Sequence, residues 1–171
     1  IIDEYGIEVV PFSYTIDGVE YIPEREFDGK AFYAAMRAGS AVKTSMVNTG
    51  TFIERFKAAL DAGKDVLYIG MSGGISGAAH AASIAVHELQ DEFPGRQIAA
   101  IDTLAASLGE GLLVLEAARM QQAGASFGEI AGRIAVRRET MCQYFTVDDL
   151  EYLKRGGRVS KTTTVVGTLL K

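Results

Sequence analysis

The spacing of apolar residues changes several times along the chain, and each change predicts a new element of secondary structure. Residues 8–21 contain alternating β-forming residues around Asp17-Gly18, which predicts two short strands joined by a turn. Apolar residues at intervals of three and four predict helices elsewhere. The first helix is expected from Asp28 to Gly39, the second carries Phe52, Phe56 and Leu60 and ends at Gly63, and the third follows the glycine cluster of residues 70–77. The fourth helix contains Leu112, Leu115, Ala118 and Met120. The fifth starts at Ser126 in a capping box with Glu129, and a short sixth helix covers residues 150–155.

Three apolar runs rich in strand formers lie between the helical stretches, at residues 66–69, 97–101 and 143–147. Because strands and helices alternate, we expect an α/β fold with a largely parallel sheet and helices on both faces. The last helical stretch stops at Gly156-Gly157, the only credible domain boundary. We therefore expect an α/β lobe over residues 1–155 and the start of a second α/β lobe over residues 156–171.

Composition narrows the classes of protein that fit. The 171 residues are 48% hydrophobic, which is enough to fill the core of one domain. A formal net charge of −5 argues against nucleic-acid binding, since phosphates require a basic face. Cys142 is the single cysteine, which fits a reducing cytoplasm, and its strand-like surroundings predict a buried, unreactive thiol. No apolar stretch approaches the length of a membrane span, so we expect no stable membrane insertion.

Polar residues cluster in three loops, at Thr44-Ser45, at Ser72 to Gly77, and at Asp102-Thr103. Ligands of parallel α/β sheets collect beyond the carboxyl ends of the strands, so we expect these loops to meet at one edge. They offer hydroxyls and the free backbone N–H groups of a helix start, a combination that suits an anion. We expect no cofactor and no metal, because His80 and His87 lack a carboxylate or cysteine partner.

The glycine cluster of residues 70–77 allows three interpretations. As a nucleotide loop it lacks the Lys-Ser/Thr ending of a P-loop and a clean G-x-G-x-x-G followed by an acid. Its first five residues match the G-x-S-x-G turn of serine hydrolases, with Ser72 as the nucleophile. His80 and His87 follow in the helix directly behind and cannot fold back onto Ser72 while that helix is intact, so this alternative requires a histidine from outside this sequence. In the third interpretation the glycines only permit a tight turn and close helix packing.

Four segments resemble the DegV family in order and spacing: "KTSMVN", "GMSGGISGAAHAA", "IDTLAASLGEGLLVLEAA" and "FTVDDLEYLKRGGRVSK". The resemblance runs from "YGIEVVPFSYTIDGVEY" to "VVGTLL", and residues 148–161 are its most specific part. It implies an α/β first lobe, a second lobe after the Gly-Gly-Arg motif, and a long-chain fatty acid between the two. It also implies that the first strand of the first lobe and most of the second lobe are absent from this sequence.

Bacterial members of that family are acyl-carrying subunits of fatty acid kinase, so the resemblance implies a carrier without chemistry of its own. Its partners would be a long-chain fatty acid and a separate ATP-dependent kinase subunit that makes the acyl phosphate. Matched residue by residue, Thr44, Ser45, Ser76 and Gly77 would hold the carboxylate, and Arg158 matches the arginine of the Gly-Gly-Arg motif. Arg158 could pair with the carboxylate or dock the kinase, and we expect docking. Further candidates in the ligand loops are Ser72, Gly73, Gly74, Asn48, Asp102 and Thr103.

Two short segments depart from the family pattern. The usual Gln-Pro-Ser after the Thr-Ser pair is Met46-Val47-Asn48 here, and the usual Thr-Tyr after the Ser-Gly turn is Ala78-Ala79. These replacements remove bulk and a hydroxyl near the position expected for the head group.

Overall fold

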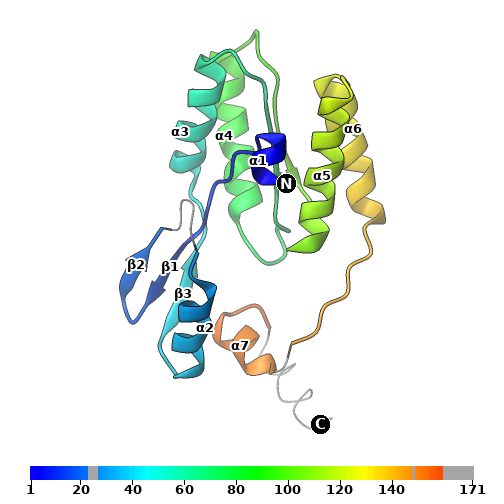
Figure 1. The fold of residues 1–171 in the computed structure, drawn as a ribbon. Coiled ribbons are helices and arrows are strands. Elements are labelled where there is room, and N and C mark those ends of the chain that lie inside the picture. Colours follow the sequence, from blue (N-terminus) through cyan, green and yellow to red (C-terminus); the bar gives the residue numbers. More distant parts are fainter. Residues whose placement is uncertain (23–26, 148, 160–171) are drawn as a thin grey trace.

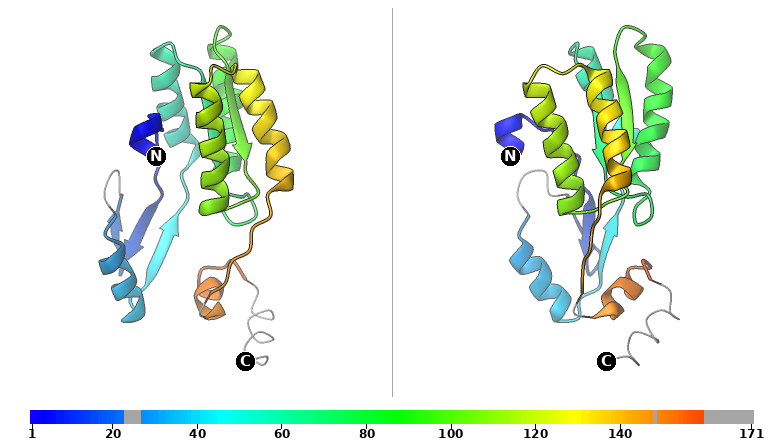
Figure 2. Two further views of the ribbon diagram at one scale, coloured as in Figure 1. Left: turned by 45° about the vertical axis from the view of Figure 1, so that its right-hand side comes forward. Right: turned by 90° about the vertical axis from the view of Figure 1, so that its right-hand side faces the viewer.

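A two-stranded parallel sheet lies between two pairs of helices in the computed structural model, which describes residues 1–22, 27–147 and 149–159 (Figure 1). Strand β4 pairs with β5 so that Val66 lies opposite Ile98 and Gly70 opposite Asp102. Helices α3 and α4 cover one face of this pair, and α5 and α6 cover the other (Figure 2). The bounds are β4 Val66–Gly70, β5 Ile98–Asp102, α3 Thr49–Asp61, α4 Ala78–Glu92, α5 Leu108–Gln122 and α6 Phe127–Arg137.

A second, antiparallel sheet lies to one side, beyond the carboxyl ends of β4 and β5 (Figure 1). Its strands are β1 (Ser13–Ile16), β2 (Val19–Tyr21) and β3 (Val42–Ser45), in the order β2-β1-β3. The β1–β2 hairpin confirms the two short strands predicted around Asp17-Gly18, and both turn residues have positive φ, at 50° and 86°. Helix α2 (Gly29–Arg37) packs against the sheet through Phe32 and Tyr14, whose ring centroids are 5.0 Å apart.

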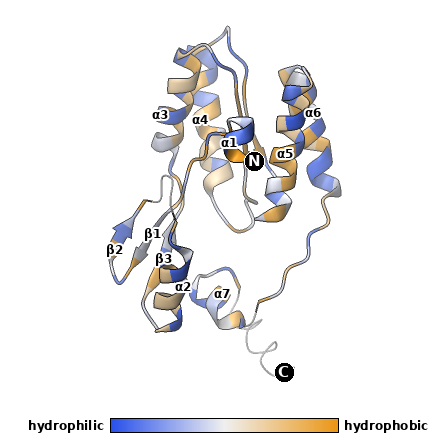
Figure 3. Cartoon of the chain, viewed as in Figure 1, coloured by the Kyte–Doolittle hydropathy of each residue, from blue (hydrophilic) through white to orange (hydrophobic). Residues whose placement is uncertain are grey.

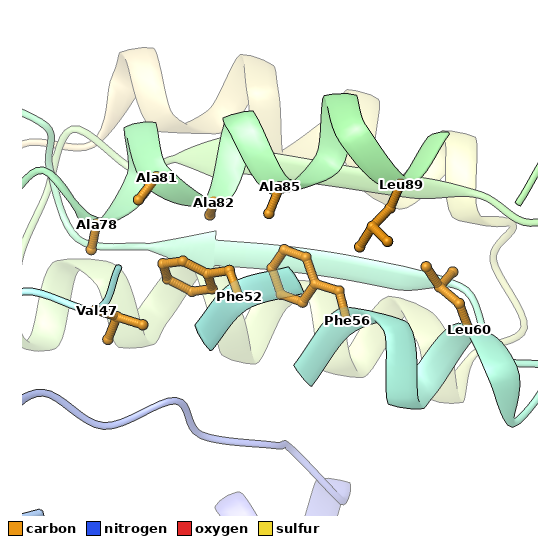
Figure 4. Packing of buried hydrophobic residues seen from close by; sticks show 9 residues of the cluster. All are labelled: Val47, Phe52, Phe56, Leu60, Ala78, Ala81, Ala82, Ala85 and Leu89. Carbon is orange, nitrogen blue, oxygen red and sulfur yellow. The ribbon is translucent and has the colours of Figure 1, made fainter. Parts of the chain in front are cut away.

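Two apolar cores hold the parallel pair between its helices. In the first, Phe52, Phe56 and Leu60 of α3 face Ala82 and Ala85 of α4 (Figure 4). The small alanines let the two helices approach closely, and each large side chain contributes about 1.5–3 kcal/mol through burial. The second core joins α5 and α6 to the other face of the sheet and contains Ile101, Leu113, Ala117, Ile130 and Ile134. The outer faces of these helices carry many of the hydrophilic residues (Figure 3).

The helix starts expected from the sequence are confirmed. Asp28 caps α2 by accepting a hydrogen bond from Ala31 N at 2.9 Å. Ser126 and Glu129 form the capping box of α6, in which Ser126 N donates to Glu129 Oε2 at 2.8 Å. The short helix predicted at residues 150–155 is also present, as α7 (Leu150–Arg155).

The strand predicted at residues 143–147 is wrong, because residues 141–147 form no regular element. The side chains of Tyr144 and Phe145 are 96% and 75% exposed, and no neighbouring strand pairs with this segment in the described part of the chain. A run of strand formers becomes a strand only where a partner accepts its hydrogen bonds. Cys142 shares this segment and is exposed, so the expected burial of its thiol is also wrong.

The α/β class is confirmed, although the parallel part of the described sheet is smaller than expected and β3 lies in the antiparallel sheet. Two further short helices were not expected from the sequence: α1 (Ile2–Tyr5) and the 3-10 helix η1 (Arg138–Thr140). Of the predicted second-lobe start at residues 156–171, residues 160–171 lie outside the described residues, as does Asp148 of the family motif.

Candidate functional site

A hollow of about 480 Å³ lies beyond the carboxyl end of β4. Three segments that are far apart in the sequence form its lining: the end of β3, the glycine loop before α4, and the residues after α7. The lining residues are Thr44, Met46, Gly73, Gly74, Ile75, Ser76, Gly77, Gly157 and Arg158. The hollow therefore occupies the edge of the sheet at which ligands of α/β folds collect.

Ser72 organises the glycine loop between β4 and α4. Its carbonyl oxygen accepts hydrogen bonds from Ile75 N and Ser76 N, both at 3.1 Å. Its side-chain oxygen accepts from Gly74 N, also at 3.1 Å. Several N–H groups of the loop are therefore already used within the turn, which fixes the path of the backbone.

Asp102, the last residue of β5, anchors the loop from the neighbouring strand. Its carboxylate accepts from Gly73 N at 3.0 Å and from Leu104 N at 2.9 Å. A Cβ atom at position 73 would lie 2.7 Å from Asp102 Oδ2, so this close approach requires glycine. Asp102 is thus bonded to the loop behind the hollow and is absent from the lining.

Thr103 ties the same two strand ends together from the inside. It is fully buried, and its Oγ1 donates to Gly70 O at 2.8 Å and accepts from Ala105 N at 3.2 Å. Ser72 N completes the connection by donating to Ala105 O at 2.8 Å. These bonds hold the β4 and β5 loops in one arrangement, so Thr103 positions the hollow without lining it.

The start of α4 supplies the groups that could hold an anion. Ser76 Oγ accepts from Ala78 N at 3.3 Å, and its own proton can be donated into the hollow. The N–H groups of Gly77 and Ala79 make no hydrogen bond to another described residue. Together with the hydroxyl of Thr44, they lie at the positive end of a 15-residue helix dipole. The positive field is therefore local, despite the net charge of −5.

Arg158 lies at the rim of this hollow, on an exposed stretch after α7. Its Nε donates to Ile75 O at 3.4 Å, and its Nη1 donates to Gly156 O. The first contact joins the arginine of the Gly-Gly-Arg motif to the glycine loop, 83 residues earlier in the chain. The guanidinium is thus held beside the candidate anion position.

Not every residue expected from the sequence lines the hollow. Ser45 follows Thr44 in β3, and successive side chains of a strand point to opposite faces, so Ser45 is absent from the lining. Asn48 caps α3 by accepting from Thr51 N at 3.0 Å. Ser72, Asp102 and Thr103 support the loops instead.

Sequence reasoning did not assign Met46, Ile75 or Gly157 to the site, although all three contribute to the lining. Ile75 lies inside the glycine cluster and Met46 directly follows the Thr-Ser pair, so their positions in the sequence could have indicated that they line the site. Both side chains are apolar, so they lack the groups by which an anion site is identified in a sequence.

The hydrolase alternative finds no general base among the described residues. Both histidines lie on α4, and neither forms a hydrogen bond with Ser72. The groups whose pKa is shifted also lie outside the hollow. Burial, and then the charges of Glu110 and Asp102, raise the pKa of Tyr68 to about 12, while burial raises the pKa of Glu110. The arrangement suits holding an anion more than proton transfer.

No helix in the described parts of the chain is both long enough and apolar enough to cross a membrane. Within the same residues, no group of three or more histidine, cysteine or acidic side chains is placed to hold a metal ion.

Comparison with known proteins gives a consistent match along the chain. The model of the DegV family, described as "Uncharacterised protein, DegV family", matches residues 1–171. A DegV domain-containing protein of Clostridium perfringens is 39% identical over 172 residues, which cover 99% of this chain and 59% of the relative. The chain thus spans less than two thirds of the length of this curated relative.

Solved structures agree with the sequence comparison. A DegV family protein from Thermus thermophilus, described by its fatty acid binding, has a TM-score of 0.82 and 32% identity, covering 100% of this chain and 60% of that one. DegV of Bacillus subtilis, described as a fatty acid binding protein, has a TM-score of 0.79 and 26% identity. The match covers 97% of this chain and 58% of the Bacillus subtilis protein. With its full length matched by the family model, this chain belongs to the DegV family.

Proposed function

We propose that this chain is part of a carrier that binds a long-chain fatty acid, with the carboxylate at the start of α4. The observation that carries this proposal is the hollow in which the hydroxyls of Thr44 and Ser76 meet the N–H groups of the helix start. The similar proteins from Thermus thermophilus and Bacillus subtilis, which are described by fatty acid binding, support the choice of ligand. Ser45, on the face of β3 opposite to Thr44, stays a proposed contributor to the carboxylate site although it does not line the hollow.

The energetics divide the work between the two ends of the ligand. Each buried methylene contributes about 0.8 kcal/mol, so some fifteen methylenes supply on the order of 12 kcal/mol before ordering costs. Each charge-assisted hydrogen bond to the carboxylate contributes about 1.5–3 kcal/mol. The tail therefore determines most of the affinity, and the hydrogen bonds to the carboxylate determine the orientation of the fatty acid.

The carrier presents the carboxylate of the bound fatty acid to a separate ATP-dependent kinase subunit, which forms the acyl phosphate. In this proposal both proteins act in the cytoplasm, where ATP is available. Arg158 docks that subunit in this proposal, because its guanidinium is exposed at the rim of the hollow. A cradle of hydroxyls and N–H groups leaves one carboxylate oxygen open to phosphoryl transfer, whereas a bidentate arginine would occupy both oxygens.

The head-group assignment is tested by the double variant Thr44→Val with Ser76→Ala. We expect at least a hundredfold loss of fatty acid affinity by calorimetry, because two donors to a charged oxygen are removed at about 1.5–3 kcal/mol each. The unfolding free energy should fall by only about 1 kcal/mol, the usual net cost of one lost hydrogen bond, here that from Ala78 N to Ser76 Oγ.

Ser126→Ala is the matched control for that experiment, because it removes the cap of α6 far from the hollow. It should lower stability to a similar degree and leave the affinity unchanged. If the double variant binds hexadecanoic acid as tightly as the parent, the head-group assignment is wrong.

The role of Arg158 is tested by Arg158→Ala, with Arg119→Ala at the far end of α5 as the control. Docking predicts that fatty acid affinity stays within about twofold while kinase-coupled turnover is lost, since a removed rim charge acts mainly on encounter with the partner. A large loss of affinity would assign Arg158 to the carboxylate instead. Unchanged affinity with unchanged turnover would leave it without a role in either step.

A further inference from the structure

Two lining residues of the hollow, Met46 and Ile75, have large apolar side chains. They are 54% and 41% exposed, respectively. The other seven lining residues are glycines or polar residues. Met46 and Ile75, which we name the apolar collar, are therefore chemically distinct from the rest of the hollow.

The backbone on either side of Met46 fixes its position. Ser45 pairs with Ser13 in the antiparallel sheet, and Val47 is buried in the first core. The side chain lies against the start of α4, because a Cβ atom at Gly77 would meet Met46 Sδ at 2.7 Å and Cε at 3.5 Å. The thioether thus covers the residue whose N–H is free for the anion.

Ile75 is fixed in a similar way within the glycine loop. Its N–H donates to Ser72 O at 3.1 Å, and its carbonyl oxygen accepts from Arg158 Nε at 3.4 Å. The collar therefore has one residue after β3 and one in the loop before α4. A carboxylate held by Ser76 and Gly77 would have its next carbon atoms beside these two side chains.

We propose that the apolar collar selects acids with an unsubstituted carbon next to the carboxylate, and that it rejects 2-hydroxy acids. This inference rests on the proposed function and adds a specificity to the same site. A hydroxyl at that carbon would face a thioether, which is a weak acceptor, and an alkyl group, which is none. Apolar pockets discriminate against an added hydroxyl by up to about a hundredfold, which bounds the expected preference.

The test compares the affinities of the whole carrier, of which this chain is a part, for hexadecanoic acid and 2-hydroxyhexadecanoic acid by calorimetry. We expect the parent to prefer hexadecanoic acid by about tenfold or more. Met46→Gln should bring the two affinities to within about threefold, because its amide can pair with the added hydroxyl. Met46→Leu should keep the preference, since it preserves the apolar surface without the sulfur.

Ile75→Thr gives a second, independent variant on the other side of the collar and should also reduce the preference. Ile84→Gln is the control, because Ile84 is 39% exposed on α4 and does not line the hollow. It should leave both affinities unchanged.

The outcomes separate the two hypotheses. If the parent does not bind hexadecanoic acid, the proposed function fails and the collar fails with it. If the parent binds both acids equally, or if Met46→Gln and Ile75→Thr both keep the preference of the parent, the collar is overturned while the proposed function stands.

Discussion

Replacing the buried Thr103 by valine should loosen the junction between the loops that follow β4 and β5. The side chain is fully buried, and its hydroxyl is the hydrogen-bond acceptor for Ala105 N at 3.2 Å. Valine has nearly the same shape but cannot accept that bond. Thr103→Val therefore tests one hydrogen-bonding group with little change in packing volume.

The expected magnitude follows from the bonds that remain. Gly70 O keeps the hydrogen bond from Thr103 N at 3.0 Å, and Ala105 O keeps that from Ser72 N at 2.8 Å, so no acceptor is left without a donor. Ala105 N loses its partner in a buried position, at a cost of about 1–3 kcal/mol. The added methyl group offsets about 0.8 kcal/mol. The net loss of unfolding free energy is therefore about 0.2–2.2 kcal/mol, and each kcal/mol lowers Tm by about 2–4 °C in a chain of this size.

Urea denaturation followed by circular dichroism measures this loss, and the m-value should stay constant because the exposed surface does not change. Thr140→Val is the matched control, since the Thr140 hydroxyl also makes two hydrogen bonds but is exposed. It should change stability by less than about 0.5 kcal/mol. If Thr103→Val is equally neutral, the hydroxyl does not hold the two loops together.

Two other variants test the site and its surroundings. Burial raises the pKa of Glu110 from 4.5, so its contribution to stability is complete below that pH and is lost as pH rises through the folded-state pKa. Glu110→Gln should therefore gain stability relative to the parent between pH 4 and pH 7 in urea melts, and parallel pH profiles would contradict this sign. Gly77→Ala should fold normally, because the φ angle of Gly77 is −75°. It should weaken fatty acid binding, because the new Cβ atom displaces the Met46 thioether. Adding Met46→Ala to the same chain should relieve that displacement and restore part of the binding.

Local signals predicted most of the fold. The Asp28 cap and the Ser126 capping box depend on neighbours three residues away, so the sequence contains the whole interaction. The residue types Asp17-Gly18 indicated the turn, although Asp17 also accepts a hydrogen bond from Ala41 N. Strand β3 was missed because its stability comes from β1, about 30 residues away. The error at residues 143–147 has the same origin, since a strand requires a partner that a local pattern does not specify.

The structure brings the predicted ligand loops together although part of the sheet beside them was predicted wrongly, and the reason is structural. The pairing of Gly70 with Asp102 brings the glycine loop and Asp102 together, and Asp102 then holds Gly73 through one hydrogen bond. Neither contact involves residues 143–147, so the wrong strand there did not displace the loop. What the sequence could not specify was the approach of Met46 to Gly77, because that contact depends on where the antiparallel sheet lies relative to α4. Motifs indicated the groups that are proposed to hold an anion, whereas the apolar side chains that are proposed to select among anions became visible only with the tertiary structure.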